Sequence, residues 1–184
     1  MFFFKKNTKQ SYPISGIYQN IVERSRSKFF YLEKNIEDSF ESRFDLIILH
    51  AFIIFYYLKE IEKKNKLSQL LFDHMFNDFD NNLREMGFGD IAVNKKMKVF
   101  ISAFYGRIAQ YSKGLDKIIS ENENLVLKKS ISNNLYKGVC ENENDLFFFQ
   151  EYILENLKNF QSKSKEKNIN NNFTFINLAE KIFE

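Results

Sequence analysis

The longest apolar stretch of the chain, LIILHAFIIFYYL at residues 46–58, places the strongest constraint on its fold. A helix needs about 18 or more consecutive apolar residues to span a bilayer. This run is shorter, carries His50 inside it and has charged residues close on both sides. It therefore predicts a buried helix, which we expect to run from about 39 to 64. Because a helix that is apolar on all sides must be surrounded by other elements, this one should form the centre of the fold.

The rest of the chain shows helical periodicity and no convincing strand alternation. Pro13 suits the start of a helix over about 14–34, since proline is favoured at the first helical position. A second periodic pattern covers 67–86 and stops at Gly87, a suitable residue for the left-handed conformation that ends many helices. The predicted fold class is all-α, a single-domain multi-helix bundle around the central apolar helix.

Two further patterns complete the helical prediction. Apolar residues recur at steps of three and four over 93–115, which predicts a long amphipathic helix. The sequence ENEN occurs at 121–124 and again at 141–144, each time ahead of an apolar periodic segment. Glutamate and asparagine suit helix N-termini, where they meet free N–H groups. We therefore expect both copies to act as caps.

Composition limits the class of protein and its partners. At 184 residues and 44% hydrophobic the chain can bury one core. Its net charge of +3 is spread along the sequence, so nucleic acid is not the favoured partner. Cys140 is the only cysteine, which excludes an internal disulfide and a Cys-rich metal site and favours a reducing compartment. We expect a cytoplasmic protein, with a peripheral position on the inner membrane as an open alternative.

The predicted organisation is an N-terminal tail at 1–12, a helical domain at 13–161, and a segment at 162–184 that holds a polar linker and a short C-terminal docking helix. The tail opens with MFFFKK, in which the charges follow the apolar residues, the reverse of a secretory signal. This segment is either a frayed end or a weak membrane-surface anchor. A membrane-surface adaptor that uses this segment and the terminal helix is one alternative function.

The segment 72–90, FDHMFNDFDNNLREMGFGD, concentrates acidic residues and one of the two histidines. At about 100° per residue the acidic side chains divide between two flanks of a helix, so they form no single cluster. His74 and Asp78 could share a metal ion, and His50 could add a third ligand if the two helices face each other. A metal- or haem-linked helical protein is therefore a second alternative. The favoured interpretation is a core histidine and solvated acids, with no metal, no cofactor and no catalytic residue.

The sequence FYGR at 104–107 places a glycine inside the longest predicted helix. Glycine there costs ~1 kcal/mol relative to alanine, which predicts that a neighbouring helix approaches closely at Gly106. Arg107 lies at the margin of the apolar stripe, where a guanidinium needs a carboxylate. We expect a structural clamp with the preceding hairpin, and the alternative is that Arg107 and Tyr105 line a partner-binding cleft. The candidate carboxylates for the clamp are Asp78, Asp80 and Asp90.

Three segments together resemble the ubiquinol-cytochrome c chaperone family: RFDLIILH at 43–50, LSQLLFDHMFNDFDNNLREMGFGDIAV at 67–93 and KKMKVFISAFYGRIAQY at 95–111. The resemblance extends more weakly to ERSRSKFFY at 23–31 and fades after 111. It implies an all-helical assembly factor of the cytochrome bc1 complex that binds newly made cytochrome b and has no catalytic residues. Mitochondrial members carry a targeting extension and work with a smaller partner protein. This chain starts almost directly at the domain, which favours a bacterial-type member. Whether it has a partner subunit is left open.

Phenylalanine and tyrosine make up much of the apolar content, at 17% of all residues. A chaperone for a membrane subunit must offer apolar surface to its client, although phenylalanine could also simply replace leucine in the core. We expect the helices containing His50, His74 and Arg107 to border an apolar cleft that receives a segment of cytochrome b. The candidate anchors are Phe72, Phe76, Phe104 and Tyr105, with Asp73 and Asp80 as rim charges that set orientation.

Overall fold

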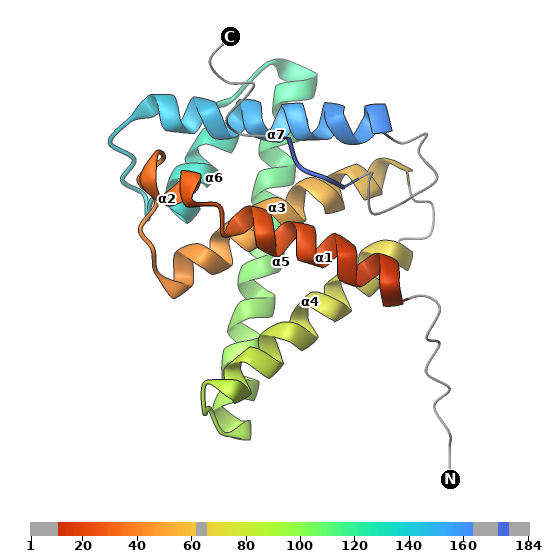
Figure 1. Ribbon diagram of the computed structural model, residues 1–184. Coiled ribbons are helices and arrows are strands. Elements are labelled where there is room, and N and C mark those ends of the chain that lie inside the picture. The colour runs from red at the N-terminus through yellow and green to blue at the C-terminus, as the bar shows by residue number, and fades with distance from the viewer. Residues whose placement is uncertain (1–10, 62–65, 164–172, 177–184) are drawn as a thin grey trace.

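A computed structural model describes residues 11–61, 66–163 and 173–176, and this part of the chain contains helices and no β-strand. Figure 1 shows α5 running through the full height of the molecule, α7 lying across its upper end, and the α4–α5 hairpin forming the lower end. The all-α prediction is confirmed. The helices are α1 (Ser11–Ser25), α2 (Lys28–Leu32), α3 (Phe40–Ile61), α4 (Lys66–Glu85), α5 (Asp90–Glu121), α6 (Leu125–Leu135) and α7 (Glu143–Lys163).

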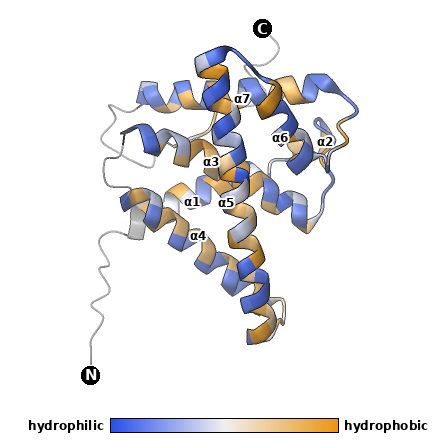
Figure 2. Cartoon of the chain, turned by 180° about the vertical axis from the view of Figure 1, so that it is seen from behind, coloured by the Kyte–Doolittle hydropathy of each residue, from blue (hydrophilic) through white to orange (hydrophobic). Residues whose placement is uncertain are grey.

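Helix α3 is the predicted central helix. It packs against α1, α4, α5, α6 and α7, and nearly all of its side chains from Leu46 to Leu58 are buried. Figure 2 shows hydrophobic and hydrophilic residues alternating along α4 and α5, as expected for amphipathic helices that cover a buried one. No helix in the described ranges has the length and apolar character that crossing a membrane requires.

The helix predicted over 14–34 is two helices, α1 and α2. Ser27 adopts an extended conformation between them, with φ −58° and ψ 127°. The chain changes direction there, and α2 then places Phe30 in the core, where its ring contacts His50, Phe149 and Tyr152. Helical periodicity continues across the break, and for this reason the sequence pattern did not reveal it.

Both ENEN segments cap helices as predicted. In the first copy, the side chain of Glu123 accepts hydrogen bonds from the backbone N–H groups of Leu125 and Val126 at the start of α6. In the second, Oδ1 of Asn142 accepts the N–H of Asn144, 3.1 Å away, at the start of α7. These bonds satisfy N–H groups that have no partner within the helix.

Glycine has two distinct roles in the α4–α5–α6 region. Gly87 has φ +87° just after α4, which confirms the predicted left-handed helix end. The prediction that a helix approaches closely at Gly106 is wrong, because a Cβ there would meet nothing within 4 Å. The close approach is at Gly114, where a Cβ would lie 2.7 Å from Cα of Leu127 in α6.

The two glycines of α5 provide a matched pair of tests. Gly114→Ala should lower the free energy of unfolding by ~1–3 kcal/mol, since the new methyl group collides with the α6 backbone. Gly106→Ala should raise it by up to ~1 kcal/mol, because alanine favours the helix and space is open there. Urea unfolding of both variants measures the difference, and equal effects would contradict the α5–α6 contact.

The C-terminal segment docks on the body, but its described residues are not helical. Phe173, Phe175 and Ile176 are buried, and the N–H of Ile176 donates to Oδ1 of Asn156 at 3.0 Å. Residues 177–184, where most of the predicted docking helix falls, lie outside the described residues. So do 164–172 of the predicted linker and the MFFFKK segment. Helix α1 begins at Ser11, inside the predicted tail. The domain limits at 12 and 161 stay predictions.

Candidate functional site

A groove between α3, α4 and α5 brings together three of the four predicted anchors. Phe72 lies on one side of it, and Phe104 and Tyr105 on another, around a cavity of about 320 Å³. We call it the aromatic groove. Its remaining lining residues are Phe55, Tyr56, Lys59, Ser68, Gln69, Ile108 and Ser112.

The four predicted anchors differ in what they can offer to a partner. Tyr105 is 57% exposed and Phe72 is partly buried, and their ring centroids lie 5.6 Å apart. Phe76 and Phe104 are buried beneath them, with Phe72 4.4 Å from Phe76 and 5.4 Å from Phe104. Phe72 and Tyr105 can therefore contact a partner, whereas Phe76 and Phe104 support them from the core.

The polar groups at the groove differ from the predicted rim. Neither Asp73 nor Asp80 lines the cavity. The hydroxyl of Tyr56 donates to Oδ1 of Asp116 at 2.7 Å, and burial together with this carboxylate raises the tyrosine pKa. Lys59 lies 5.5 Å from the centre of the Tyr56 ring. The charge that lines the groove is thus the cation of Lys59.

The carboxylate that pairs with Arg107 is Asp45 of α3. Nε of Arg107 lies 2.7 Å from Oδ1 of Asp45, and the two side chains are 24% and 8% exposed. The atoms form an ion pair without the alignment of a good hydrogen bond. Burial raises the pKa of Asp45 to about 6, and the charge of Arg107 opposes that rise. The clamp thus ties α5 to the central helix.

The three carboxylates predicted for this clamp have other partners. Asp78 accepts a hydrogen bond from Tyr18 at 2.8 Å, while Asp80 and Asp90 both pair with Arg84. The prediction is wrong because Phe72 contacts Tyr105 across the antiparallel α4–α5 hairpin. In that register Arg107 lies level with residues before Phe72, more than one helical turn from Asp78.

His50 is a buried core histidine. Its Nδ1 lies 2.7 Å from the carbonyl oxygen of Leu46 and 3.0 Å from Oγ of Ser25, and its Nε2 lies 3.0 Å from the hydroxyl of Tyr152. A carbonyl can only accept, so we assign the proton to Nδ1, and Nε2 then accepts from Tyr152. Burial lowers the pKa of His50 to about 3, which keeps the ring neutral.

The alternative metal site of His50, His74 and Asp78 is not formed. His74 packs edge-on to Tyr18 with centroids 5.4 Å apart, and Asp78 accepts bonds from Tyr18 and Asn82. Across 11–61, 66–163 and 173–176, no group of three or more His, Cys, Asp or Glu side chains is placed to hold a metal ion. The metal- or haem-linked alternative has no support from the described residues.

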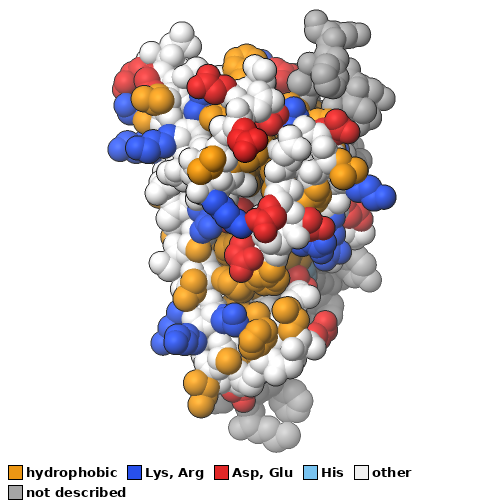
Figure 3. Space-filling model, turned by 90° about the vertical axis from the view of Figure 1, so that its left-hand side faces the viewer, with side chains coloured by type: hydrophobic (Ala, Val, Ile, Leu, Met, Phe, Trp, Pro, Cys, Tyr) orange, Lys and Arg blue, Asp and Glu red, His pale blue; other side chains and the backbone are white. Residues whose placement is uncertain are grey.

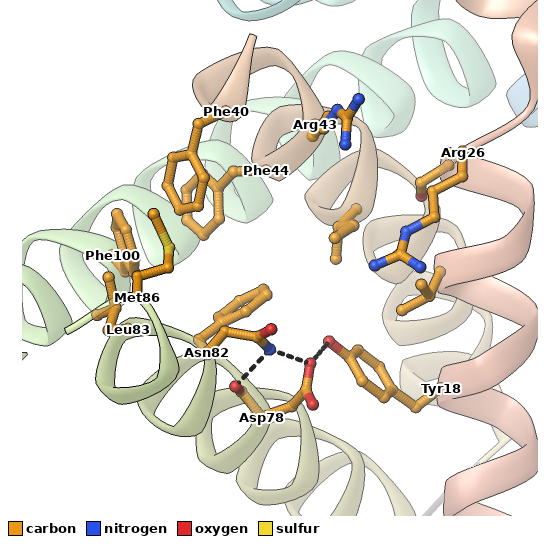
Figure 4. Close-up of a pocket in the computed structure, with 14 residues that line it drawn as sticks. Tyr18, Arg26, Phe40, Arg43, Phe44, Asp78, Asn82, Leu83, Met86 and Phe100 are labelled. Carbon is orange, nitrogen blue, oxygen red and sulfur yellow. Dashed lines mark hydrogen bonds between the residues drawn. The ribbon is translucent and has the colours of Figure 1, made fainter. Parts of the chain in front are cut away.

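A second cavity, of about 180 Å³, lies where α1, α3, α4 and α5 meet, and no sequence pattern predicted it. Figure 4 shows Tyr18, Asp78 and Asn82 joined by hydrogen bonds at one end and a group of aromatic side chains at the other. We call it the hairpin pocket. Its lining residues are Tyr18, Val22, Ser25, Arg26, Phe40, Arg43, Phe44, Ile47, Asp78, Phe79, Asn82, Leu83, Met86 and Phe100. The sequence feature that could have indicated this pocket is the pair Phe40 and Phe44, which lie one helical turn apart just before the apolar run.

A family model described as ubiquinol-cytochrome C chaperone matches residues 33–175 of this chain. The chain belongs to this family. The match confirms the resemblance seen in the sequence and continues to 175, well beyond the segments that first indicated it. It covers the aromatic groove completely, and the hairpin pocket except for Tyr18, Val22, Ser25 and Arg26.

Individual relatives agree with the family assignment. The chain is 23% identical over 151 residues to ubiquinol-cytochrome c reductase complex assembly factor 1 of Mus musculus, covering 82% of this chain and 50% of that protein. The Homo sapiens protein of the same name is also 23% identical, with 82% and 49% covered. The chain therefore spans about half the length of these curated relatives.

The fold is shared with a solved structure. The crystal structure of the Cbp3 homolog from Brucella abortus superposes with a TM-score of 0.76 and 26% sequence identity, over 94% of this chain and 93% of that one. The similarity covers nearly the whole length of both chains, so the helical bundle described above is a common architecture.

Proposed function

We propose that this chain is a chaperone that binds newly made cytochrome b and promotes assembly of the cytochrome bc1 complex. Family membership over 33–175 supports the role in assembly. The observation that carries the binding step is the aromatic groove, in which Tyr105 is 57% exposed beside Phe72. Large exposed aromatic residues in a groove are typical of protein interaction sites.

The groove suits an apolar segment that has not yet entered the membrane. Water-exposed apolar surface costs about 25 cal/mol per Å², so such a segment gains by packing on Phe72 and Tyr105. Phe76 and Phe104 hold these rings from below and reduce the entropy that ordering them would cost. Lys59 at the edge would set the orientation of a segment that carries an acidic flank.

The proposed role is binding without catalysis, and it requires no cofactor. The histidine in the core, His50, is neutral and engaged through both ring nitrogens. The client is a membrane protein, so we propose that the chain works on the cytoplasmic side of the inner membrane, in peripheral contact with it. A smaller partner protein, implied by the family resemblance, stays a prediction.

Deletion and capture together test this function. Cells that lack the chain should contain less assembled cytochrome bc1 complex on native gels, and the intact chain should restore it. The chain, used as bait on native membranes under mild detergent, should enrich cytochrome b above other membrane proteins. Normal complex levels in the deletion strain, or no enrichment of cytochrome b, would contradict the proposal.

A further inference from the structure

We propose that the hairpin pocket is a second docking site, which takes a segment of a partner protein that inserts one bulky apolar side chain and places a carboxylate against Arg26. The inference does not rest on the function proposed above. The pocket and the aromatic groove share no lining residue. The two sites are therefore built from separate sets of side chains.

The interior of the pocket has the size and chemistry for an apolar side chain. The rings of Phe44 and Phe100 lie 4.7 Å apart on one wall, and Phe79 stands 5.4 Å from Phe44. Leu83 and Ile47 complete the apolar surface. An apolar cavity of about 150 Å³ is enough to hold a benzene-sized group, and this one is about 180 Å³.

One cation on the pocket wall, Arg26, has no ion-pair partner among the described residues. Arg43 is held by Asp38 through two bonds, of 2.7 and 3.0 Å. Asp78 accepts from Tyr18 and from Asn82. Arg26 is exposed and makes no ion pair or side-chain hydrogen bond with any residue that the structure describes, and Figure 4 shows its guanidinium directed into the pocket.

A neighbouring cavity adds a further cation next to Arg26 and Arg43. It has a volume of about 540 Å³, shares Arg26 and Arg43 with the hairpin pocket and adds Lys28 and Leu32. Asp38 is the acidic residue that lines it and is already bound to Arg43. The two cavities together are lined by the cations Arg26, Lys28 and Arg43 against the carboxylates Asp38 and Asp78, so they favour an occupant with negative charge.

The rim of the pocket points to a protein segment as the occupant. Phe40 is 46% exposed and Met86 is 59% exposed at the pocket edge, so apolar surface continues beyond the cavity. Figure 3, the view from the left-hand side of Figure 1, shows hydrophobic side chains gathered on its lower half, below a belt of mixed charges. A small anion would fill the cavity and leave the apolar rim exposed to solvent, whereas a peptide would cover both the cavity and the rim.

Methionine NMR gives a direct readout of occupancy. The chain has four methionines, of which Met86 lines the pocket and Met75 is fully buried elsewhere in the core. The probe is a synthetic amphipathic helical peptide with leucine and phenylalanine on one face and glutamate beside it. A second peptide carries glutamine in place of each glutamate. With methyl-labelled protein, the glutamate peptide should shift the Met86 signal and leave Met75 unchanged.

Charge reversal then isolates the role of Arg26. Arg26→Glu should weaken binding of the glutamate peptide about tenfold and leave the glutamine peptide unaffected. Lys129→Glu, an exposed site on α6 outside the pocket, is the matched control and should change neither affinity. An unshifted Met75 signal in each variant reports that the fold is intact.

Three results would overturn the proposal. The first is no Met86 shift with either peptide up to about 1 mM. The second is equal affinity for both peptides, or an affinity that Arg26→Glu does not change. The third is a Met86 shift with octanoate or with phosphatidylglycerol vesicles but not with peptide, which would assign the pocket to a small acyl anion or to lipid.

Discussion

Arg107→Ala is expected to lower the free energy of unfolding by ~3 kcal/mol or more at neutral pH, as measured by urea denaturation. Arg107 is the cation paired with Asp45, whose side chain is only 8% exposed. Without it the folded protein must either bury an unpaired carboxylate or protonate it. Both options cost free energy.

The effect should depend on pH in a defined direction. The pKa of Asp45 is about 6 in the folded protein, against about 3.9 in an unfolded chain. Between these values the folded state binds a proton that the unfolded state lacks, so the stability contributed by Asp45 falls as pH rises from about 4 to about 6. Arg107 lowers this pKa, and its removal must raise it further. The destabilisation by Arg107→Ala should therefore be smallest near pH 5 and grow toward pH 7.5.

Two controls separate charge from packing in this experiment. Combining Arg107→Ala with Asp45→Asn removes the unpaired charge, so the double variant should be more stable than Arg107→Ala alone at pH 7.5. It should also lose most of the pH dependence. A pH-independent effect of Arg107→Ala would mean that the arginine stabilises the fold through its contact with the ring of Phe44 and not through Asp45.

Replacing both Phe72 and Tyr105 with alanine is expected to weaken binding of cytochrome b by a factor of about a thousand. Each aromatic anchor at a binding hot spot contributes roughly 2 kcal/mol, and ~4 kcal/mol corresponds to that factor. The measurement is the amount of cytochrome b captured from detergent-treated membranes over a range of bait concentrations. The same variant should fail to restore the cytochrome bc1 complex in the deletion strain.

The structure decides which anchors can be tested in this way. Phe76 and Phe104 are 6% and 2% exposed, and removing a buried phenylalanine costs ~3–5 kcal/mol of stability. Their loss would unfold the groove along with the rest of the core, so a variant lacking all four aromatics cannot report on binding. Phe72 and Tyr105 present ring surface to solvent and are the informative pair.

A matched control uses exposed apolar residues outside the groove. Ile119 and Leu125 are 65% and 69% exposed, and their double alanine variant should bind cytochrome b as the intact chain does. Unchanged capture by a folded Phe72 and Tyr105 double variant would place the client site elsewhere. Helix α7, where Phe147 is 52% exposed, would then be the next surface to test.

The sequence alone determined the class of fold, the central helix, the long α5, the two ENEN caps and the family. These features depend on residues three or four positions apart, or on short segments, and such neighbours are already fixed by the local geometry of a helix. The apolar run at 46–58 has no polar face, so no arrangement other than burial was open to it.

Only the tertiary structure decided which residues meet across helices. Arg107 and Asp45 lie on different helices, and the pairing depends on how α5 crosses α3. The packing of α6 on α5 meets Gly114 and leaves Gly106 in open space. The hairpin pocket needs α1, α3, α4 and α5 together, and no periodic pattern within one helix contains it. Helical periodicity says which face of each helix is buried, but the register between helices is set by side-chain packing over the whole core.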